Sequence, residues 1–231
     1  MDLSDHFLDT NILIGHLIPW DNYNSRAVAY MCQGGLSRHT SFRVYEECRN
    51  VFLRNKVLVP RYLKAIEIYP DSSNKEVNKI WADDFLDEYI ASEELDEIES
   101  RTLRGFVKRN ADDIARMLVG EISKEEYIDT ILRAVRASLN ALDKQCNPNS
   151  PVVRRYDVAD DYRSLYRREL TELQRSIMNR NDVMILLDSY YIRHKYIGRD
   201  VLFMTMDKAD LLNNKDIIEK TMQGLYIAPL P

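Results

Sequence analysis

The sequence predicts an α/β protein whose parallel sheet is built from the two ends of the chain. Short apolar runs typical of buried strands open the stretch of residues 6–15 and make up residues 201–205 and 225–228. Helical patterns alternate with these runs, and such alternation favours a parallel sheet flanked by helices. Between about residues 71 and 179, apolar residues recur at helical spacing almost throughout. We therefore expect a helical subdomain inserted into an α/β core.

The length of the chain fits one large domain, or one ordinary domain that carries a large insertion. Its 231 residues exceed what an ordinary single domain needs for its core. We expect a sheet-forming core of residues 1–70 and 176–231. The all-helical insertion would then comprise residues 71–175.

Composition excludes several classes of protein. Hydrophobic residues make up 45% of the sequence and charged residues 30%, the balance of a globular domain. No apolar run approaches the roughly 18 residues that a membrane span requires, and the acidic first residues are unlike a secretory signal. Three cysteines without metal-ligand spacing, Cys32, Cys48 and Cys146, suit a reducing compartment. We expect a cytoplasmic protein with no membrane partner.

The N-terminal elements follow from apolar spacing and cap residues. The run HFLDTNILIG at residues 6–15 reads as a buried strand that ends in polar Asp9, Thr10 and Asn11. Residues 25–33 form a short helix that two glycines end. Ser41 is placed to cap a helix over residues 42–55, whose buried stripe consists of Val44, Cys48, Val51 and Phe52.

The later elements are predicted in the same way. Ser123 and Glu126 form a capping-box pattern at the start of a long helix, and the proline-containing stretch 146–151 indicates a loop. Residues 157–175 fit an arginine-bearing helix, and residues 182–195 fit a helix capped by Asn181. The runs 201–205 and 225–228 then return the chain to the sheet.

Four acidic residues are candidates for a shared site. Asp9 and Asp207 each follow an apolar run, and sites in parallel sheets lie at the carboxyl ends of the strands. At roughly 100° per residue, Glu47 and Asp182 border the buried stripes of their helices, whereas Glu46 faces solvent. Taken singly, each acid also fits an ordinary turn, cap or boundary position. Together, with no basic residue beside them, they are typical of a Mg²⁺ or Mn²⁺ site that activates water.

The segments around these acids resemble the motifs of PIN-domain nucleases. FLDTNIL at residues 7–13 resembles the opening strand motif, and SFRVYEE at 41–47 resembles the second, which places Glu47 at the acidic position. NDVMIL at 181–186 is similar to the third motif and carries Asp182. FMTMDKAD at 203–210 is similar to the last and carries Thr205 and Asp207.

The resemblance implies a small parallel α/β/α fold and metal-dependent hydrolysis of single-stranded RNA by metal-activated water. It implies that Mg²⁺ or Mn²⁺ is held by Asp9, Glu47, Asp182 and Asp207, with Asp9 and Asp182 as the primary ligands. Thr10, Asn11 and Thr205 would position the cluster or the substrate. About 125 residues separate the second and third motifs, far more than in compact members of the family. Four roles fit a helical insertion of this size: a lid, an RNA platform, an interface with a second copy of the chain, or a docking site for a regulatory protein.

The charge is uneven along the chain, although the net charge is only −5. Residues 76–99 hold ten acids, and residues 154–180 hold seven arginines. Arg163, Arg167 and Arg168 lie at neighbouring helical positions among tyrosines, a pattern that can grip RNA. The same arginines also fit a solvated helix whose charges pair with nearby acids.

Two other functions remain open at this level. A PIN-like fold can serve as a non-catalytic binding module, and the same carboxylates can hydrolyse structured DNA. Other enzyme classes lack their signatures: the sequence has no P-loop, no dinucleotide-binding glycine motif and no nucleophile elbow.

Overall fold

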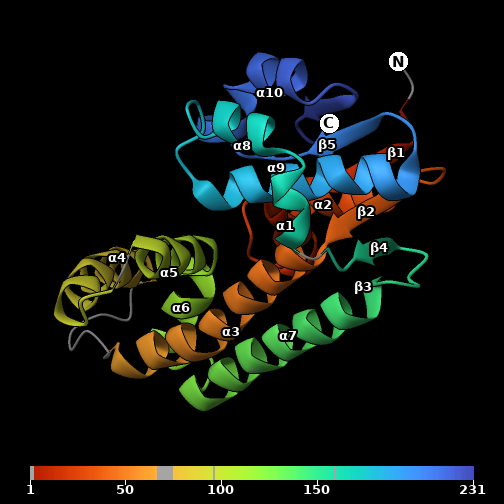
Figure 1. Cartoon of the computed structure of the whole chain (residues 1–231). Helices are drawn as coiled ribbons and strands as arrows, with labels where there is room; N and C mark the ends of the chain where they lie inside the picture. The colour runs from red at the N-terminus through yellow and green to blue at the C-terminus, as the bar shows by residue number, and fades with distance from the viewer. Residues whose placement is uncertain (1–2, 67–74, 96, 159) are drawn as a thin grey trace. The chain divides into compact units, whose positions relative to one another are not determined.

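The computed structural model describes residues 3–66, 75–95, 97–158 and 160–231 (Figure 1). In these residues, six strands form one all-parallel sheet in the order β3-β4-β2-β1-β5-β6. The α/β class and the parallel sheet predicted from the sequence are thus confirmed. The strands are β1 (Asp5–Leu8), β2 (Ser37–Ser41), β3 (Cys146–Asn147), β4 (Val153–Tyr156), β5 (Val201–Met204) and β6 (Leu225–Ala228).

Apolar side chains hold the middle of the sheet together. All four residues of β1 are buried, and β1 lies between β2 and β5. Phe7 and Phe203 are register partners on β1 and β5, and their fully buried rings stack 5.4 Å apart. A central parallel strand is covered on both faces, which explains why β1 reads as a short apolar run.

Strand β2 was not predicted, because its sequence, SRHTS, is polar. Four of its five residues are nevertheless buried, and most of their polar groups are hydrogen-bonded within the fold, although Arg38 Nε has no hydrogen-bond partner among the described residues. Arg38 donates to the carbonyl oxygens of Tyr30 and Gln33, and Thr40 donates to the carbonyl oxygen of Leu8. Hydrogen bonding therefore replaces the apolar pattern that normally marks a buried strand.

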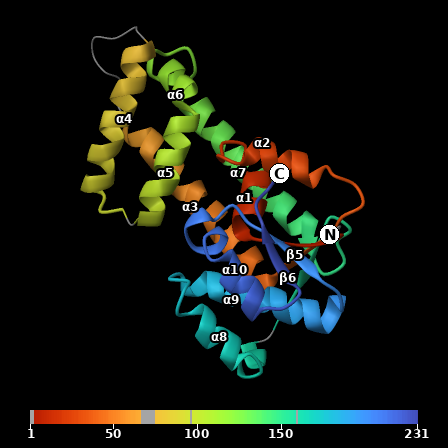
Figure 2. The same cartoon turned by 90° about the horizontal axis from the view of Figure 1, so that it is seen from above.

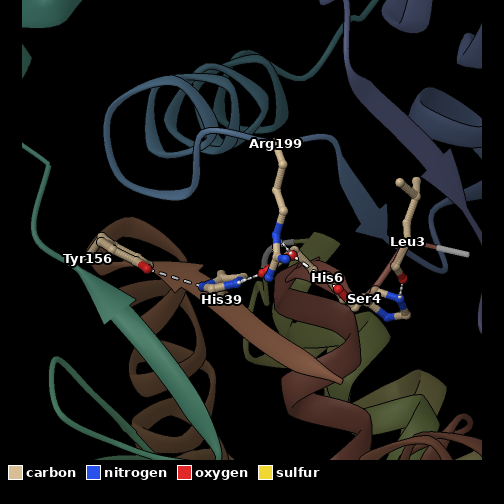
Figure 3. Close-up of polar contacts among 7 residues, drawn as sticks. Leu3, Ser4, His6, His39, Tyr156 and Arg199 are labelled. Atoms are coloured by element: carbon tan, nitrogen blue, oxygen red, sulfur yellow. Dashed lines mark hydrogen bonds and ion pairs between the residues drawn. The ribbon is translucent and has the colours of Figure 1, made fainter. Parts of the chain in front are cut away.

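A polar network ties three strands together around the first residue of β1 (Figure 3). His39 on β2 shares a hydrogen bond of 3.0 Å with Asp5 Oδ1, and its other ring nitrogen lies 3.2 Å from the Tyr156 hydroxyl on β4. Arg199, just before β5, pairs with Asp5 Oδ2. Asp5 is only 3% exposed, so these partners supply the charge and hydrogen bonds that a buried carboxylate needs.

The chain divides into two compact units, and two long helices belong to both. The first unit comprises residues 1–17, 25–49 and 141–231, and the second comprises residues 18–24 and 50–140. The divisions fall inside α3 (Phe42–Ala65) and α7 (Lys124–Gln145). The sheet lies in the first unit. Its other helical segments are α1 (Thr10–Leu17), α2 (Asn24–Met31), η1 (Asp160–Ser164), α8 (Arg167–Leu173), α9 (Arg180–Ile192), η2 (Arg193–Ile197), η3 (Lys208–Leu212) and α10 (Lys215–Thr221).

The described residues of the second unit form helices, turns and loops, and no strand. It contains α4 (Lys75–Ser92), α5 (Glu97–Arg109) and α6 (Ala111–Leu118), which lie side by side in Figure 2. Tyr62 of α3 is fully buried here: its hydroxyl donates to the carbonyl oxygen of Ala82, and its ring contacts Phe85 and Tyr89. Trp20 packs edge-on against Phe106.

The helical region is smaller than the expected insertion of residues 71–175. Residues 146–147 and 153–156 are strands β3 and β4 of the sheet, because β4 pairs in parallel with β2. The divisions at 49/50 and 140/141 therefore replace those expected at 70/71 and 175/176. Nor do residues 157–175 form one helix, since they contain the short segments η1 and α8.

Cap residues explain where several helices begin. Ser41 Oγ accepts from the Val44 amide at the start of α3, and Ser123 Oγ accepts from the Glu126 amide at the start of α7, as predicted. Helix α9 is capped by Asn179, whose Oδ1 accepts from the Asn181 amide; the predicted cap, Asn181, lies inside the helix. Helix α3 continues ten residues past the predicted end at 55, because buried Val59, Tyr62 and Leu63 extend its apolar stripe.

None of the helices described is both long and apolar enough to cross a lipid bilayer.

Candidate functional site

Polar residues gather where the two central strands end. β1 and β5 are paired neighbours, and parallel strands deliver their carboxyl ends to the same edge. Asp9 follows the last residue of β1, and Thr205 and Asp207 follow the last residue of β5. The candidate site lies at this edge, in the first unit.

Asp9 is buried and held by three donors. Its Oδ1 accepts from the Thr10 amide at 2.7 Å, which caps the first turn of α1. Its Oδ2 accepts from Asn11 Nδ2 at 2.8 Å and from the Thr205 hydroxyl at 2.6 Å. With the residue only 4% exposed, both oxygens are oriented by the protein itself.

Asn11 and Thr205 join the ends of the two strands. Asn11 Nδ2 lies 3.1 Å from Thr205 Oγ1, and Asn11 Oδ1 accepts from the Met206 amide at 2.9 Å. Thr205 Oγ1 also accepts from the Asp207 amide at 3.0 Å. These bonds set the positions of Asp9 and Asp207 relative to each other.

Glu47 reaches the same edge from α3. Its Oε2 accepts from the Thr10 hydroxyl at 2.8 Å and from Asn181 Nδ2 at 2.9 Å. Glu47 is half-buried, whereas its neighbour Glu46 is exposed, as the helical angle predicted. Asn181, which the sequence analysis treated only as a helix cap, thus links α9 to Glu47.

Three other carboxylates form the tightest group. One oxygen each of Asp182, Asp207 and Asp210 lies within 4.8 Å of the other two. Asp182 Oδ2 is buried and has no hydrogen-bond partner among the described residues. Asp207 Oδ1 accepts from the amides of Ala209 and Asp210, and Asp210 Oδ2 accepts from the Asn179 amide. Asp210 was not among the predicted site residues, although its place three residues after Asp207 could have indicated it.

Burial, together with nearby negative charge, raises the pKa values of Asp182 and Asp9. Burial raises the pKa of Asp182 to about 8, and repulsion by Asp9, Asp207, Glu47 and Asp210 adds to the effect. Burial likewise raises the pKa of Asp9 to about 6, although hydrogen bonds from Thr205 and Thr10 oppose the rise. At neutral pH the Asp182 carboxyl therefore favours a proton or another positive partner.

This arrangement fits a divalent cation bound by oxygen. Mg²⁺ and Mn²⁺ prefer carboxylate oxygens together with water. Asp182, Asp207 and Asp210 each offer an oxygen, and these oxygens lie close enough together to bind one ion. Asp182 Oδ2 is buried without a hydrogen-bond partner among the described residues, and a bound cation would stabilise its charge. Asp9 and Glu47 add negative charge and orient the surrounding donors. The four predicted metal ligands therefore fall into two pairs. Asp182 and Asp207 belong to the group of three close carboxylates, whereas Asp9 and Glu47 are held beside it by hydrogen bonds.

The predicted RNA-binding arginines are not equivalent. Arg167 and Arg168 are exposed on α8, whereas Arg163 on η1 is half-buried. Tyr162, expected among them as a stacking residue, is 2% exposed and donates its hydroxyl to Asp188 Oδ1. Tyr162 is therefore part of the core.

Asp188 is a buried acid on α9. At roughly 100° per residue it lies about 140° from the centre of the helix's apolar stripe, so helical angle alone places it away from the core. It is 2% exposed, because η1 and α8 cover the face of α9 that the sequence left to solvent. Arg43 Nε lies 3.3 Å from Asp188 Oδ2 and compensates its charge. Since the Arg43 pair already supplies a cation, Asp188 is structural.

Comparisons of the chain with protein-family models, with curated proteins and with solved structures each return no match.

Proposed function

We propose that this protein is a PIN-like nuclease that uses Mg²⁺ or Mn²⁺ to hydrolyse single-stranded RNA. The observation that carries the proposal is the buried, unpartnered Asp182 Oδ2 within reach of Asp207 and Asp210, at the carboxyl edge of a parallel sheet. The four sequence motifs that resemble PIN-domain nucleases meet at that edge and favour RNA as the substrate.

The surroundings of each acidic residue indicate its role in the proposed reaction. Asp182, Asp207 and Asp210 would hold the cation, which when bound supplies an activated water and neutralises charge on the attacked phosphate. Asp9, fixed by Thr10, Asn11 and Thr205, keeps its carboxylate in one orientation beside this group. Glu47, fixed by Thr10 and Asn181, does the same from α3. With a metal-activated water as the attacking group, the proposed reaction would need no covalent enzyme intermediate.

Cleavage of an end-labelled single-stranded RNA in Mn²⁺ tests the proposal. We expect the wild type to cut, and EDTA, Asp182→Asn and Asp9→Asn each to abolish cutting. Asp216→Asn is the matched control, because Asp216 is an exposed aspartate on α10 outside the site. Full activity of Asp182→Asn in protein free of contaminating nuclease would refute the proposal.

Two further outcomes separate the alternatives. Cutting of flapped or single-stranded DNA with no cutting of RNA would assign the same chemistry to DNA. No cutting together with no Mn²⁺ binding by calorimetry would indicate a non-catalytic binding module. The cytoplasmic location, and the expected contact of the helical region with a second copy or a regulatory protein, stay predictions.

A further inference from the structure

The five carboxylates of the site pose an electrostatic problem for the substrate. Asp9, Glu47, Asp182, Asp207 and Asp210 repel a phosphodiester backbone, and one divalent cation offsets only two of their charges. A polyanion can approach only if cations lie beside the cluster. The structure offers such cations in the segment that leads into α9.

Residues 175–181, here called the rim segment, are attached to the site at two points. The Asn179 amide donates to Asp210 Oδ2 at 3.3 Å, and Asn181 Nδ2 donates to Glu47 Oε2 at 2.9 Å. Ile177, only 3% exposed, anchors the segment in the core. The rim segment therefore borders the acidic cluster and is fixed in place there.

Three other residues of the rim segment have exposed side chains. Met178 is 94% exposed, far more than its apolar side chain favours. Arg175 and Arg180 on either side are also exposed, and no acid in the described part of the chain lies within ion-pair distance of them. In the sequence, an exposed apolar residue thus lies between two exposed arginines, in a segment that contacts the site.

Because the proposed function requires an RNA strand at the acidic cluster, we infer that the rim segment holds that strand: Arg175 and Arg180 pair with backbone phosphates, and Met178 packs against a nucleobase. Guanidinium groups match phosphate geometry with two donors at once. A thioether side chain makes favourable contacts with aromatic rings. The inference rests on the proposed function and differs from the sequence prediction, which assigned RNA contact to Arg163, Arg167 and Arg168.

Binding of a short fluorescent single-stranded RNA, followed by anisotropy in EDTA, tests the inference without requiring catalysis. In the double variant Arg175→Ala/Arg180→Ala we expect affinity to fall about tenfold, and the slope of log affinity against log salt to shrink by about 1.4, since each phosphate contact on a single strand contributes about 0.7. Met178→Ser should weaken binding about two- to tenfold with no change in the salt slope. All three residues are exposed, so unchanged melting temperatures should accompany these losses.

The pair Arg167 and Arg168 provides the matched control, because both are exposed arginines on α8 outside the rim segment. Arg167→Ala/Arg168→Ala should change affinity less than the rim double variant. An equal loss in both double variants would overturn the inference, since it would reflect overall charge alone. Equal affinity for a DNA strand of the same sequence would overturn the choice of RNA.

Cleavage assays on the same proteins distinguish this inference from the proposed function. RNA cutting by the wild type, with binding untouched in the rim variants, would overturn the inference and leave the nuclease proposal intact. Binding that depends on Arg175 and Arg180 without any cutting would support the inference and overturn the nuclease proposal. Neither binding nor cutting would overturn both.

Discussion

The hydroxyl of Thr205 donates a hydrogen bond of 2.6 Å to Asp9 Oδ2, across 196 positions of sequence. Asp9 lies at the end of β1 and Thr205 at the end of β5, so the bond forms only once these strands have paired. The acidic cluster is therefore a product of tertiary folding. Its most buried acid depends on a donor from the other end of the chain.

Removing that donor should destabilise the protein. Thr205 is fully buried, and Thr205→Val removes one of the two hydrogen bonds that the charged Asp9 Oδ2 accepts, at a cost of about 1.5–3 kcal/mol. We expect the urea midpoint to fall at pH 7 with an unchanged m-value. Thr205→Ser keeps the hydroxyl and should lose much less stability. Because valine keeps the methyl group and serine keeps the hydroxyl, a valine variant as stable as the wild type, or a serine variant that loses as much stability as the valine variant, would contradict the assignment of the effect to the hydrogen bond.

Glu46 and Glu47 provide a paired test of the cation site on adjacent residues. Only Glu47 faces the acidic cluster, where its Oε2 is held by Thr10 and Asn181. Glu47→Gln should weaken Mn²⁺ binding about tenfold, the loss typical of residues that support a metal site. Glu46→Gln, on the exposed side of α3, should leave the calorimetric affinity unchanged. Similar affinities in both variants would exclude Glu47 from the site.

The raised pKa of Asp182 predicts how stability depends on pH in the metal-free protein. The folded state holds a proton up to about pH 8, whereas the unfolded chain releases it near the ordinary value of 3.8. Between these values the folded state binds more protons, so stability falls as pH rises through this window. Asp182→Asn removes the titration and should be more stable than the wild type at pH 8, by on the order of 1 kcal/mol after allowance for solvent screening.

Urea unfolding in EDTA from pH 4 to 9 measures this difference, which should shrink toward pH 4. Mn²⁺ should reverse the order at pH 8, because an ion that binds only the folded wild type stabilises it. A stability difference that stays constant with pH would contradict the assignment of the raised pKa to Asp182.

The fold was predictable where burial leaves an apolar signature. β5 and β6 were expected at residues 201–205 and 225–228, and they span Val201–Met204 and Leu225–Ala228. β2 was missed because its buried residues are polar and form hydrogen bonds, and the partners of His39 and Thr40 lie 34 and 32 positions away in the sequence. β3 and β4 were missed for a related reason: they are short, they flank a loop that contains two prolines, and only strand pairing defines them, β4 with β2 and β3 with β4.

The site was predictable where one helix or strand end decides the position of a side chain. Helical angle separated Glu47 from Glu46, and strand ends located Asp9 and Asp207. The same method failed for Asp188, because a second layer of chain covers α9. It also could not identify Asp210, whose role depends on how the turn after Asp207 folds back toward Asn179.

The network around Asp5 should make stability sensitive to acid. Burial favours a higher pKa for Asp5, but hydrogen bonds from Arg199 and then His39 outweigh it and hold the pKa below 3.8. A lowered carboxyl pKa stabilises the folded state above pH 3.8, and this contribution disappears as pH falls through the folded pKa. Arg199→Ala should therefore cost about 1 kcal/mol at pH 7, a modest value because the Arg199 side chain is 63% exposed.

Urea titrations of Arg199→Ala and wild type at pH 7 and near pH 3 test this contribution. The difference in free energy of unfolding between the two proteins should be smaller at the lower pH, because protonated Asp5 no longer attracts the Arg199 guanidinium group (Figure 3). Arg167→Ala, which removes an exposed arginine on α8, should track the wild type at both pH values. If the two proteins differ in free energy of unfolding by the same amount at pH 7 and pH 3, the loss reflects packing of the Arg199 side chain. The low pKa of Asp5 would then depend on its hydrogen bond with His39 and not on Arg199.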